Sequence, residues 1–192
     1  MKIFNQIILI LWLVFLVYWL VSAIGAKRSV RDGSWWKGAL FRLILIALIL
    51  LLMRTSQFGP LLRNIGNDET GSSSIVLSSI GVFFCASGIA LAIWARVYIG
   101  RNWGMPMSLR EDPELVTTGP YSFVRHPIYT GMLIAVLGSI LVGGIFWLVP
   151  FVLVCAYFVY SAKTEEKHML QQFPKAYPEY RKRVKALIPF IW

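Results

Sequence analysis

Two short polar segments hold the side chains best suited to chemistry. The first is Arg125-His126-Pro127-Ile128-Tyr129, which combines a guanidinium, an imidazole and a phenol, and the second is the acidic pair Glu165-Glu166. A carboxylate binds amino groups or sugar hydroxyls through charge-assisted hydrogen bonds, and an aromatic face attracts a cation. A histidine or glutamate within reach of a substrate also accepts a proton. Each segment alone is a weak signal, and the two become informative only if the chain brings them together.

Two apolar stretches lie between these segments, at residues 128–142 and 145–160, joined by Gly143-Gly144. Each is shorter than the roughly 20 residues of a full membrane span, so we expect a tight hairpin of short helices. Because a hairpin returns the chain near its starting point, we predict that His126 and Glu165 approach each other. Small residues along the first stretch suit close helix packing, although glycine is also common in membrane helices in general: Gly131, Gly138, Ser139 and Gly143.

The composition places the chain in a membrane. Hydrophobic residues make up 57% and charged residues only 15% of the 192 residues, and the charges cluster between long apolar runs. Further apolar runs occupy residues 7–24, 39–53 and 75–99. With the hairpin, they predict an all-α integral membrane bundle of about five transmembrane helices. Residues 1–93 would form the N-terminal membrane helices, and residues 94–192 the functional region of one membrane domain.

The first apolar run also has a feature of a signal peptide, because small residues at positions 22–26 follow it. Signal-peptide cores are usually ~7–15 residues long and follow a positively charged segment. Here the run is longer, and the positive charges Lys27 and Arg28 come after it. We therefore expect a retained helix.

The basic residues predict the orientation of the bundle. The formal net charge is +10, but the Lys and Arg residues flank apolar runs, which is typical of topology signals and contacts with anionic lipids rather than nucleic-acid binding. Placing the N-terminus outside puts most of them on the cytoplasmic side. The loop at residues 101–125 and the C-terminal tail then share the cytoplasmic face. Two histidines, and two cysteines inside apolar runs, give no metal-ligand spacing, so we expect no metal site.

Further ordered motifs accompany the two polar segments: Leu115-Val116-Thr117-x-Gly119-x-Tyr121, Arg125-His126-Pro127-x-Tyr129-x-Gly131, Phe173, Tyr177-x-x-Tyr180, Lys182-Arg183-Val184 and Ile188-Pro189. In these residues the chain resembles the isoprenylcysteine carboxyl methyltransferase family and, more loosely, phospholipid methyltransferases. The resemblance covers roughly residue 94 onward.

The resemblance implies a membrane methyltransferase that uses S-adenosyl-L-methionine, with S-adenosyl-L-homocysteine as product. Its acceptor would be a lipidated or lipid-like molecule that is methylated on a carboxyl group and enters sideways from the bilayer. The cofactor would lie at the cytoplasmic face. The residues that the resemblance assigns to the cofactor are Pro113, Glu114, Leu115, Val116, Tyr121, His126, Pro127, Ile128, Tyr129 and Glu165.

The predicted acceptor site departs from the pattern of the family at one position. Four residues before the cofactor glutamate, enzymes that methylate prenylated cysteine carry an arginine that holds the substrate carboxylate, whereas this chain has Ser161. A serine donates one hydrogen bond but forms no bidentate charged clamp. Ser161 and Arg125 are therefore the predicted acceptor contacts, the identity of the acceptor stays open, and no single residue is predicted to be catalytic.

Other interpretations compete with this one. A looser similarity to membrane sterol reductases with a His-Pro-x-Tyr element predicts an NADPH-dependent reductase. The similarity to phospholipid methyltransferases predicts N-methylation of a phospholipid. A third possibility is a membrane scaffold without catalytic activity. Each site residue also has a structural interpretation. These are a helix cap or an interfacial position for His126, a lipid anchor for Arg125, a solvated turn with Lys163 or Lys167 for Glu165 and Glu166, and interfacial aromatics for Tyr121 and Tyr129. For Tyr177 and Tyr180 the interfacial interpretation is preferred.

Overall fold

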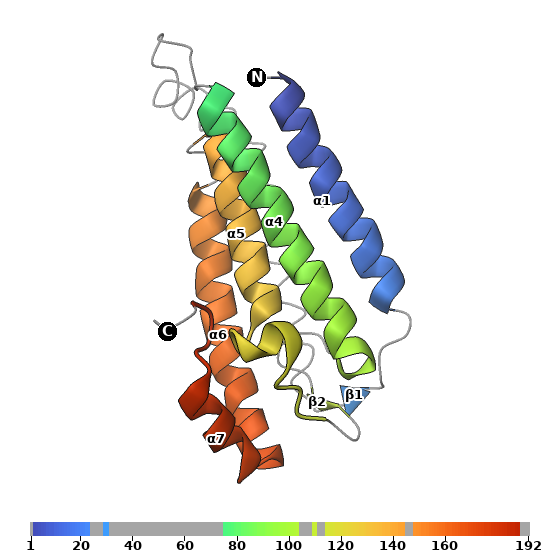
Figure 1. The fold of residues 1–192 in the computed structure, drawn as a ribbon, viewed down its shortest axis with the longest axis vertical. Helices are drawn as coiled ribbons and strands as arrows, with labels where there is room; N and C mark the ends of the chain where they lie inside the picture. Colours follow the sequence, from blue (N-terminus) through green and yellow to red (C-terminus); the bar gives the residue numbers. More distant parts are fainter. Residues whose placement is uncertain are drawn as a thin grey trace.

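The computed structural model describes residues 2–23, 29–30, 75–103, 109–110, 114–144 and 148–188. In chain order the elements are α1 (Lys2–Ala23), β1 (Ser29–Val30), α4 (Ile75–Ile99), the 3₁₀ helix η1 (Gly100–Asn102), β2 (Leu109–Arg110), the 3₁₀ helix η2 (Gly119–Ser122), α5 (Pro127–Gly143), α6 (Leu148–Gln172) and α7 (Ala176–Arg183). Helices α4, α5 and α6 run side by side, α1 leans along α4, and α7 lies at the far end of α6 (Figure 1).

The predicted helical fold is confirmed, with one small addition. Strands β1 and β2 pair antiparallel over two residues each, with Ser29 opposite Arg110 and Val30 opposite Leu109. The predicted run at residues 39–53 lies outside the described residues, so the five-span topology stays a prediction. Two helices of the described part are long and apolar enough to cross a membrane, at Ile3–Ser22 and Ile75–Asn102.

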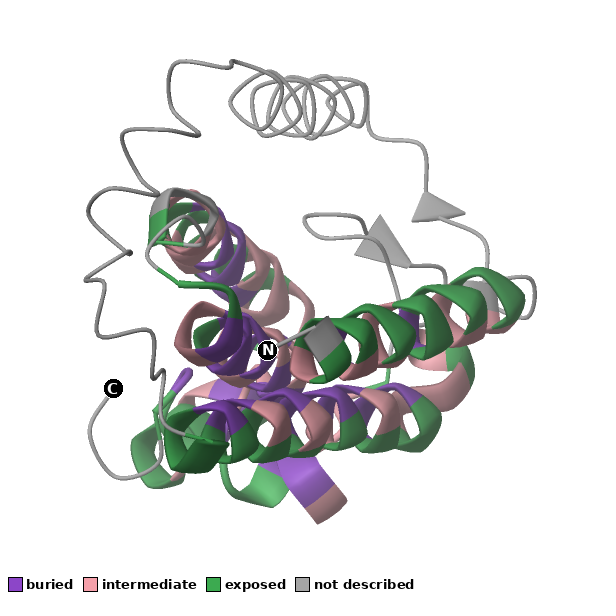
Figure 2. Ribbon diagram, turned by 90° about the horizontal axis from the view of Figure 1, so that it is seen from above, coloured by how far each residue is buried: buried purple, intermediate pink, exposed green. Residues whose placement is uncertain are grey.

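The outer surface of α1 fits a lipid environment. Most of its large apolar side chains are exposed, as the outward-facing green ribbon in Figure 2 shows. Water would penalise such a continuous apolar face, whereas lipid tails do not. A few residues of α1 are buried, and these face the other helices: Ile8 and Phe15.

The predicted hairpin forms, but its second helix is not short. Helix α5 begins at Pro127, where the missing N–H costs nothing in the first turn. It is followed by the capping residue Gly144, whose φ of +80° suits a glycine. Helix α6 continues for 25 residues, beyond its apolar half, to Gln172. No glycine or proline interrupts residues 161–172, so the helical hydrogen bonds continue when the polarity changes.

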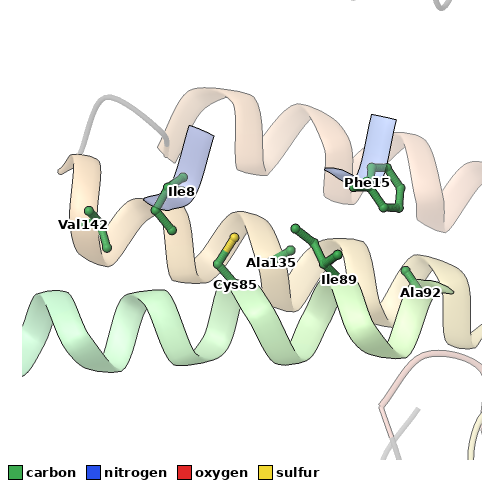
Figure 3. Packing of buried hydrophobic residues seen from close by; sticks show 7 residues of the cluster. All are labelled: Ile8, Phe15, Cys85, Ile89, Ala92, Ala135 and Val142. Carbon is green, nitrogen blue, oxygen red and sulfur yellow. The ribbon is translucent and has the colours of Figure 1, made fainter. Parts of the chain in front are cut away.

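Small residues bring α4 and α5 into direct backbone contact. A Cβ added to Gly81 would lie 2.7 Å from the carbonyl oxygen of Gly138, and one added to Gly131 would lie 2.5 Å from that of Gly88. The predicted packing role of Gly131 and Gly138 is therefore confirmed, and α4 is the partner. Figure 3 shows the core beside this contact, which consists of Ile8, Phe15, Cys85, Ile89, Ala92, Ala135 and Val142.

Polar contacts attach α1 to this pair of helices. The indole Nε1 of Trp12 donates to Ser139 Oγ of α5 at 3.1 Å. Near the C-terminal end of α1, the buried Arg96 of α4 donates to the carbonyl oxygens of Ser22 and Gly100 and lies 4.5 Å from the ring centroid of Trp103. Helix α1 is thus attached to α5 near its middle and to α4 near its end.

Candidate functional site

Residues 114–126, here called the His126 loop, lead to α5 and rest on the C-terminal end of α4. Gly119 has a φ of +59°, and a Cβ there would lie 2.5 Å from the ring of Tyr98, so this turn needs glycine. The hydroxyls of Tyr98 and Thr118 are 2.7 Å apart, and Tyr121 Oη donates to Ala95 O at 3.4 Å. The loop is therefore packed and hydrogen-bonded rather than free in solvent.

His126 and Glu165 lie close together, as the hairpin predicts. The imidazole Nδ1 of His126 is 3.5 Å from Glu165 Oε2, and Tyr129 Oη donates to Glu165 Oε1 at 2.5 Å. The three side chains come from the start of α5 and from the polar half of α6. His126 occupies the position before the first turn of α5 but makes no side-chain cap, so the predicted capping alternative is wrong.

Glu166 has different partners from Glu165. Arg125 donates through Nε at 2.9 Å and through Nη2 to Glu166 Oε1, and Arg181 Nε lies 3.5 Å from Glu166 Oε2. The Nε2 of His126 is 3.6 Å from Glu166 Oε1. Glu166 therefore faces Arg125, Arg181 and His126. It does not form the solvated turn with Lys163 or Lys167.

The pKa values of Glu166 and His126 are shifted in opposite directions by their surroundings. Burial by itself raises the pKa of Glu166, but the hydrogen bonds and charges of His126 and Arg125 outweigh it and lower this pKa to about 2. For His126, burial by itself lowers the pKa, but the neighbouring carboxylates of Glu165 and Glu166 outweigh burial and raise this pKa above its ordinary value. Glu166 is therefore ionised at neutral pH, and His126 holds its proton more tightly than an imidazole in water.

A segment from beyond α7 closes the site. Residues 184–188, here called the C-terminal strap, run parallel to the His126 loop through a bridge between Val124 and Lys185. The N–H of Arg125 donates to Lys185 O at 2.8 Å, and that of His126 donates to Ala186 O at 3.0 Å. Thr130 Oγ1 adds a bond to Leu187 O at 2.7 Å. The backbone at His126 is therefore fixed by the strap.

The ring of Tyr129 lies in an aromatic stack. The His126 ring is nearly parallel to it, with centroids 5.5 Å apart, and the Phe158 ring is parallel with centroids 4.5 Å apart. These rings take up surface that an adenine or a cation would need. The hydroxyl of Tyr129 is engaged by Glu165, and the predicted contact of Tyr129 with the cofactor stays a prediction.

The other predicted site residues differ in accessibility. Glu114 is exposed, and Leu115, Val116 and Ile128 are half-buried, whereas Tyr121 and Pro127 are buried. Ser161 is 0% exposed, and its Oγ has no hydrogen-bond partner. Pro113 lies outside the described residues.

Two predictions about side chains are wrong. Tyr177 and Tyr180 are buried rather than interfacial, and Tyr180 Oη donates to Tyr121 O at 2.5 Å. Arg125 is not a free lipid anchor, because Glu166 and the backbone carbonyls of Arg181 and Val184 engage its guanidinium, and its contact with a substrate stays a prediction. Its side chain is only 8% exposed.

Sequence reasoning missed two contributors. Arg181 pairs with Glu166 from α7, and its place in a basic cluster concealed this role. Phe158 stacks on Tyr129. A signal for Phe158 existed, because it lies seven residues, about two helical turns, before Glu165 and so shares a face of α6 with it.

Comparison with known proteins identifies the family. A family model described as phospholipid methyltransferase matches residues 76–176, which cover α4 through the first residue of α7. The chain is 35% identical to the protein-S-isoprenylcysteine O-methyltransferase of Schizosaccharomyces pombe over 178 residues, which are 91% of this chain and 67% of that protein.

Two further relatives show related names. Protein-S-isoprenylcysteine O-methyltransferase B of Arabidopsis thaliana is 32% identical over 119 residues, 60% of each chain. Methanethiol S-methyltransferase 1 of Bradyrhizobium diazoefficiens is 32% identical over 88 residues, 41% of this chain and 27% of that protein. The chain thus spans between about a quarter and two thirds of these relatives' lengths. All three names describe methyl transfer, which favours that chemistry over the reductase and scaffold alternatives. The chain belongs to the isoprenylcysteine carboxyl methyltransferase family of membrane proteins.

Proposed function

We propose that this protein is an S-adenosyl-L-methionine-dependent methyltransferase at the cytoplasmic face of a membrane. The observation that carries the proposal is the contact of Glu165 with both His126 and Tyr129 at the polar end of the α5–α6 hairpin. The proposal includes the five-span topology, with the N-terminus outside, and the division into N-terminal helices at residues 1–93 and a catalytic region at residues 94–192. The length and apolar composition of α1 and α4, which are sufficient for each to cross a membrane, support the membrane location.

Glu165 is the carboxylate that a soluble ligand reaches. Its side chain is 26% exposed, against 11% for Glu166, and the negative charge of Glu166 already faces Arg125 and Arg181. We assign to Glu165 the amino group or the sugar hydroxyls of the cofactor, because a carboxylate binds both through charge-assisted hydrogen bonds. Tyr129 Oη and the His126 ring hold this carboxylate in place.

Other residues would line the cofactor. The exposed Glu114 and the half-buried Leu115 and Val116 precede the packed turn at Gly119. The turn that follows them rests on α4 through the contacts of Tyr98 with Thr118 and Gly119. This support limits the motion at the end of the segment, as a binding site requires.

Methyl transfer requires little more from the protein than the positioning of the reactants. S-adenosyl-L-methionine, when bound, supplies a methyl group on a leaving group that is already activated. An ionised carboxylate acceptor needs no base, so the residues around His126 serve to align the reactants and to exclude water. If the acceptor is a thiol or an amine, His126 or Glu165 takes its proton.

The acceptor would come from the bilayer, past Ser161. This serine lies one helical turn before Glu165, on the same face of α6, and its buried hydroxyl has no hydrogen-bond partner. Burying a hydroxyl without a hydrogen-bond partner costs free energy, and a polar group of the methyl acceptor would supply that partner. We therefore propose a lipidated or lipid-like acceptor whose reactive group contacts Ser161, with carboxyl O-methylation as the reaction.

The test uses purified protein in lipid nanodiscs with methyl-labelled S-adenosyl-L-methionine and either a prenylated cysteine or extracted lipids. We expect labelled product, and base-labile label identifies a methyl ester. The variant Glu165→Gln should weaken binding of S-adenosyl-L-homocysteine by roughly tenfold to a hundredfold. The matched control is Glu179→Gln, at an exposed glutamate of α7, which should bind like wild type. Binding of NADPH without binding of S-adenosyl-L-homocysteine would refute the proposal.

A further inference from the structure

The side chain of Arg125 joins three parts of the molecule. Its Nε and Nη2 donate to Glu166 of α6, while its Nη1 donates to Val184 O and, at 3.4 Å, to Arg181 O. Arg125 itself belongs to the His126 loop. Few side chains other than arginine bridge a carboxylate and two carbonyls at once, because only its guanidinium carries five donors in one rigid plane.

The strap depends on this bridge for its position. Its backbone pairs with Arg125 and His126, and Ala186 and Leu187 pack into the cluster that contains Tyr129 and Phe158. The carbonyl of Val184 lies at the point where α7 ends and the strap begins, so the Arg125 bond fixes the direction in which the chain leaves the helix.

The other end of the bridge fixes the imidazole. Glu166 Oε1 accepts from Arg125 and lies 3.6 Å from His126 Nε2, so the carboxylate that holds Arg125 also faces His126. The ring of His126 is then confined between Glu166, Glu165 and the ring of Tyr129. If the bridge is lost, both the backbone and the ring of His126 lose a restraint.

We infer that Arg125 and Glu166 are positioning residues, which fasten the C-terminal strap to the His126 loop and thereby hold His126 at the proposed cofactor site. In its kinetic part this inference rests on the proposed function. It assigns Glu166 to the architecture of the site and leaves Glu165 to the ligand. The two adjacent glutamates thus have separate roles.

Limited trypsin digestion tests the strap directly. The peptide bond after Lys185 lies in the backbone pairing with Arg125 and His126, so it is cut only when the strap leaves the loop. We expect Arg125→Ala and Glu166→Gln to speed cleavage after Lys185 by about tenfold or more. Arg125→Lys keeps the charge facing Glu166 but cannot span to Val184 O, so its cleavage rate should be intermediate.

The control variant is Lys182→Ala. Lys182 is exposed on α7 and pairs with Glu179, so cleavage after Lys185 should stay at the wild-type rate. Cleavage of the Arg125 and Glu166 variants at the wild-type rate would overturn the inference. If Arg125→Ala does not fold, Arg125→Lys and Glu166→Gln carry the comparison.

Kinetics separates positioning from a loss of folded protein. Misfolding lowers the amount of active enzyme and therefore kcat, whereas a misplaced His126 raises the KM for S-adenosyl-L-methionine. We expect Arg125→Lys to raise this KM by about tenfold while kcat changes by less than about threefold. An unchanged KM with a reduced kcat would contradict the inference. If wild type neither binds S-adenosyl-L-homocysteine nor transfers methyl groups, the proposed function fails, and the proteolysis alone then decides the inference.

Discussion

Gly88 of α4 and Gly131 of α5 lie so close that a Cβ on Gly88 would stand 2.4 Å from the carbonyl oxygen of Gly131. Seven residues away on each helix, Gly81 and Gly138 repeat the contact. Because α5 starts directly after His126, this contact determines where His126 and its neighbours lie relative to α4. The packing of α4 against α5 is thus linked to the position of the polar cluster at the start of α5.

The variant Gly131→Ala tests this contact. The new methyl group meets backbone atoms, which cannot rotate away, so the helices must separate at a cost of about 1–3 kcal/mol. The measurement is the thermal unfolding midpoint in detergent, which should fall. Ala90→Val, on the exposed side of α4, is the control and should leave the midpoint nearly unchanged. Equal midpoints for both variants would show that the glycine contact does not determine the packing.

Tyr129→Phe removes the hydroxyl that donates to Glu165 and keeps the ring in its stack with Phe158. Hydrogen bonds to charged groups contribute about 1.5–3 kcal/mol, so we expect affinity for S-adenosyl-L-homocysteine to fall by roughly tenfold. The unfolding midpoint should also fall, because this hydrogen bond is present without ligand, and the affinity is therefore compared at a temperature where both proteins are folded. Isothermal titration measures the affinity. Tyr160→Phe, at an exposed tyrosine of α6, serves as the control, and a similar loss there would contradict the assignment.

Ser161→Ala and Ser139→Ala form a matched pair of buried serines. Ser139 accepts from Trp12 and donates to Ala135 O, so its replacement should cost about 1 kcal/mol. Ser161 has no hydrogen-bond partner, and its replacement should be neutral or slightly stabilising without acceptor. If Ser161 contacts the acceptor, the KM for acceptor should rise severalfold while that for the cofactor stays constant. A destabilisation of Ser161→Ala equal to that of Ser139→Ala would contradict this interpretation.

The pH dependence of stability should show the charge environment of His126. Its pKa in the folded protein lies above the ordinary value, so the folded state binds the proton more tightly than the unfolded state. The resulting stabilisation is fully present below about pH 6.5 and declines as the pH rises through the raised pKa. Unfolding midpoints of wild type and His126→Gln, measured from pH 5 to pH 9, check this. The difference between them should shrink as the pH rises, and a difference that grows would show that the sign is wrong.

Much of the helical framework was readable from local patterns. The run at residues 75–99 coincides with α4, and Pro127 and Gly144 mark the ends of α5. Proline and glycine act through their own backbone geometry, and apolar runs act through hydropathy, so neither depends on distant residues. The end of α6 was less predictable, because a change in polarity does not interrupt helical hydrogen bonds.

The sequence by itself also determined that an imidazole and an acidic pair meet, because a hairpin of known length returns the chain to its start. Only the tertiary structure decided which glutamate faces Arg125, that the Tyr129 ring is stacked, and that residues 184–188 run beside His126. Arg125 and Glu166 are 41 positions apart, and two adjacent glutamates look alike in a sequence. Their roles differ because consecutive residues of a helix point about 100° apart, so each carboxylate meets a different part of the fold.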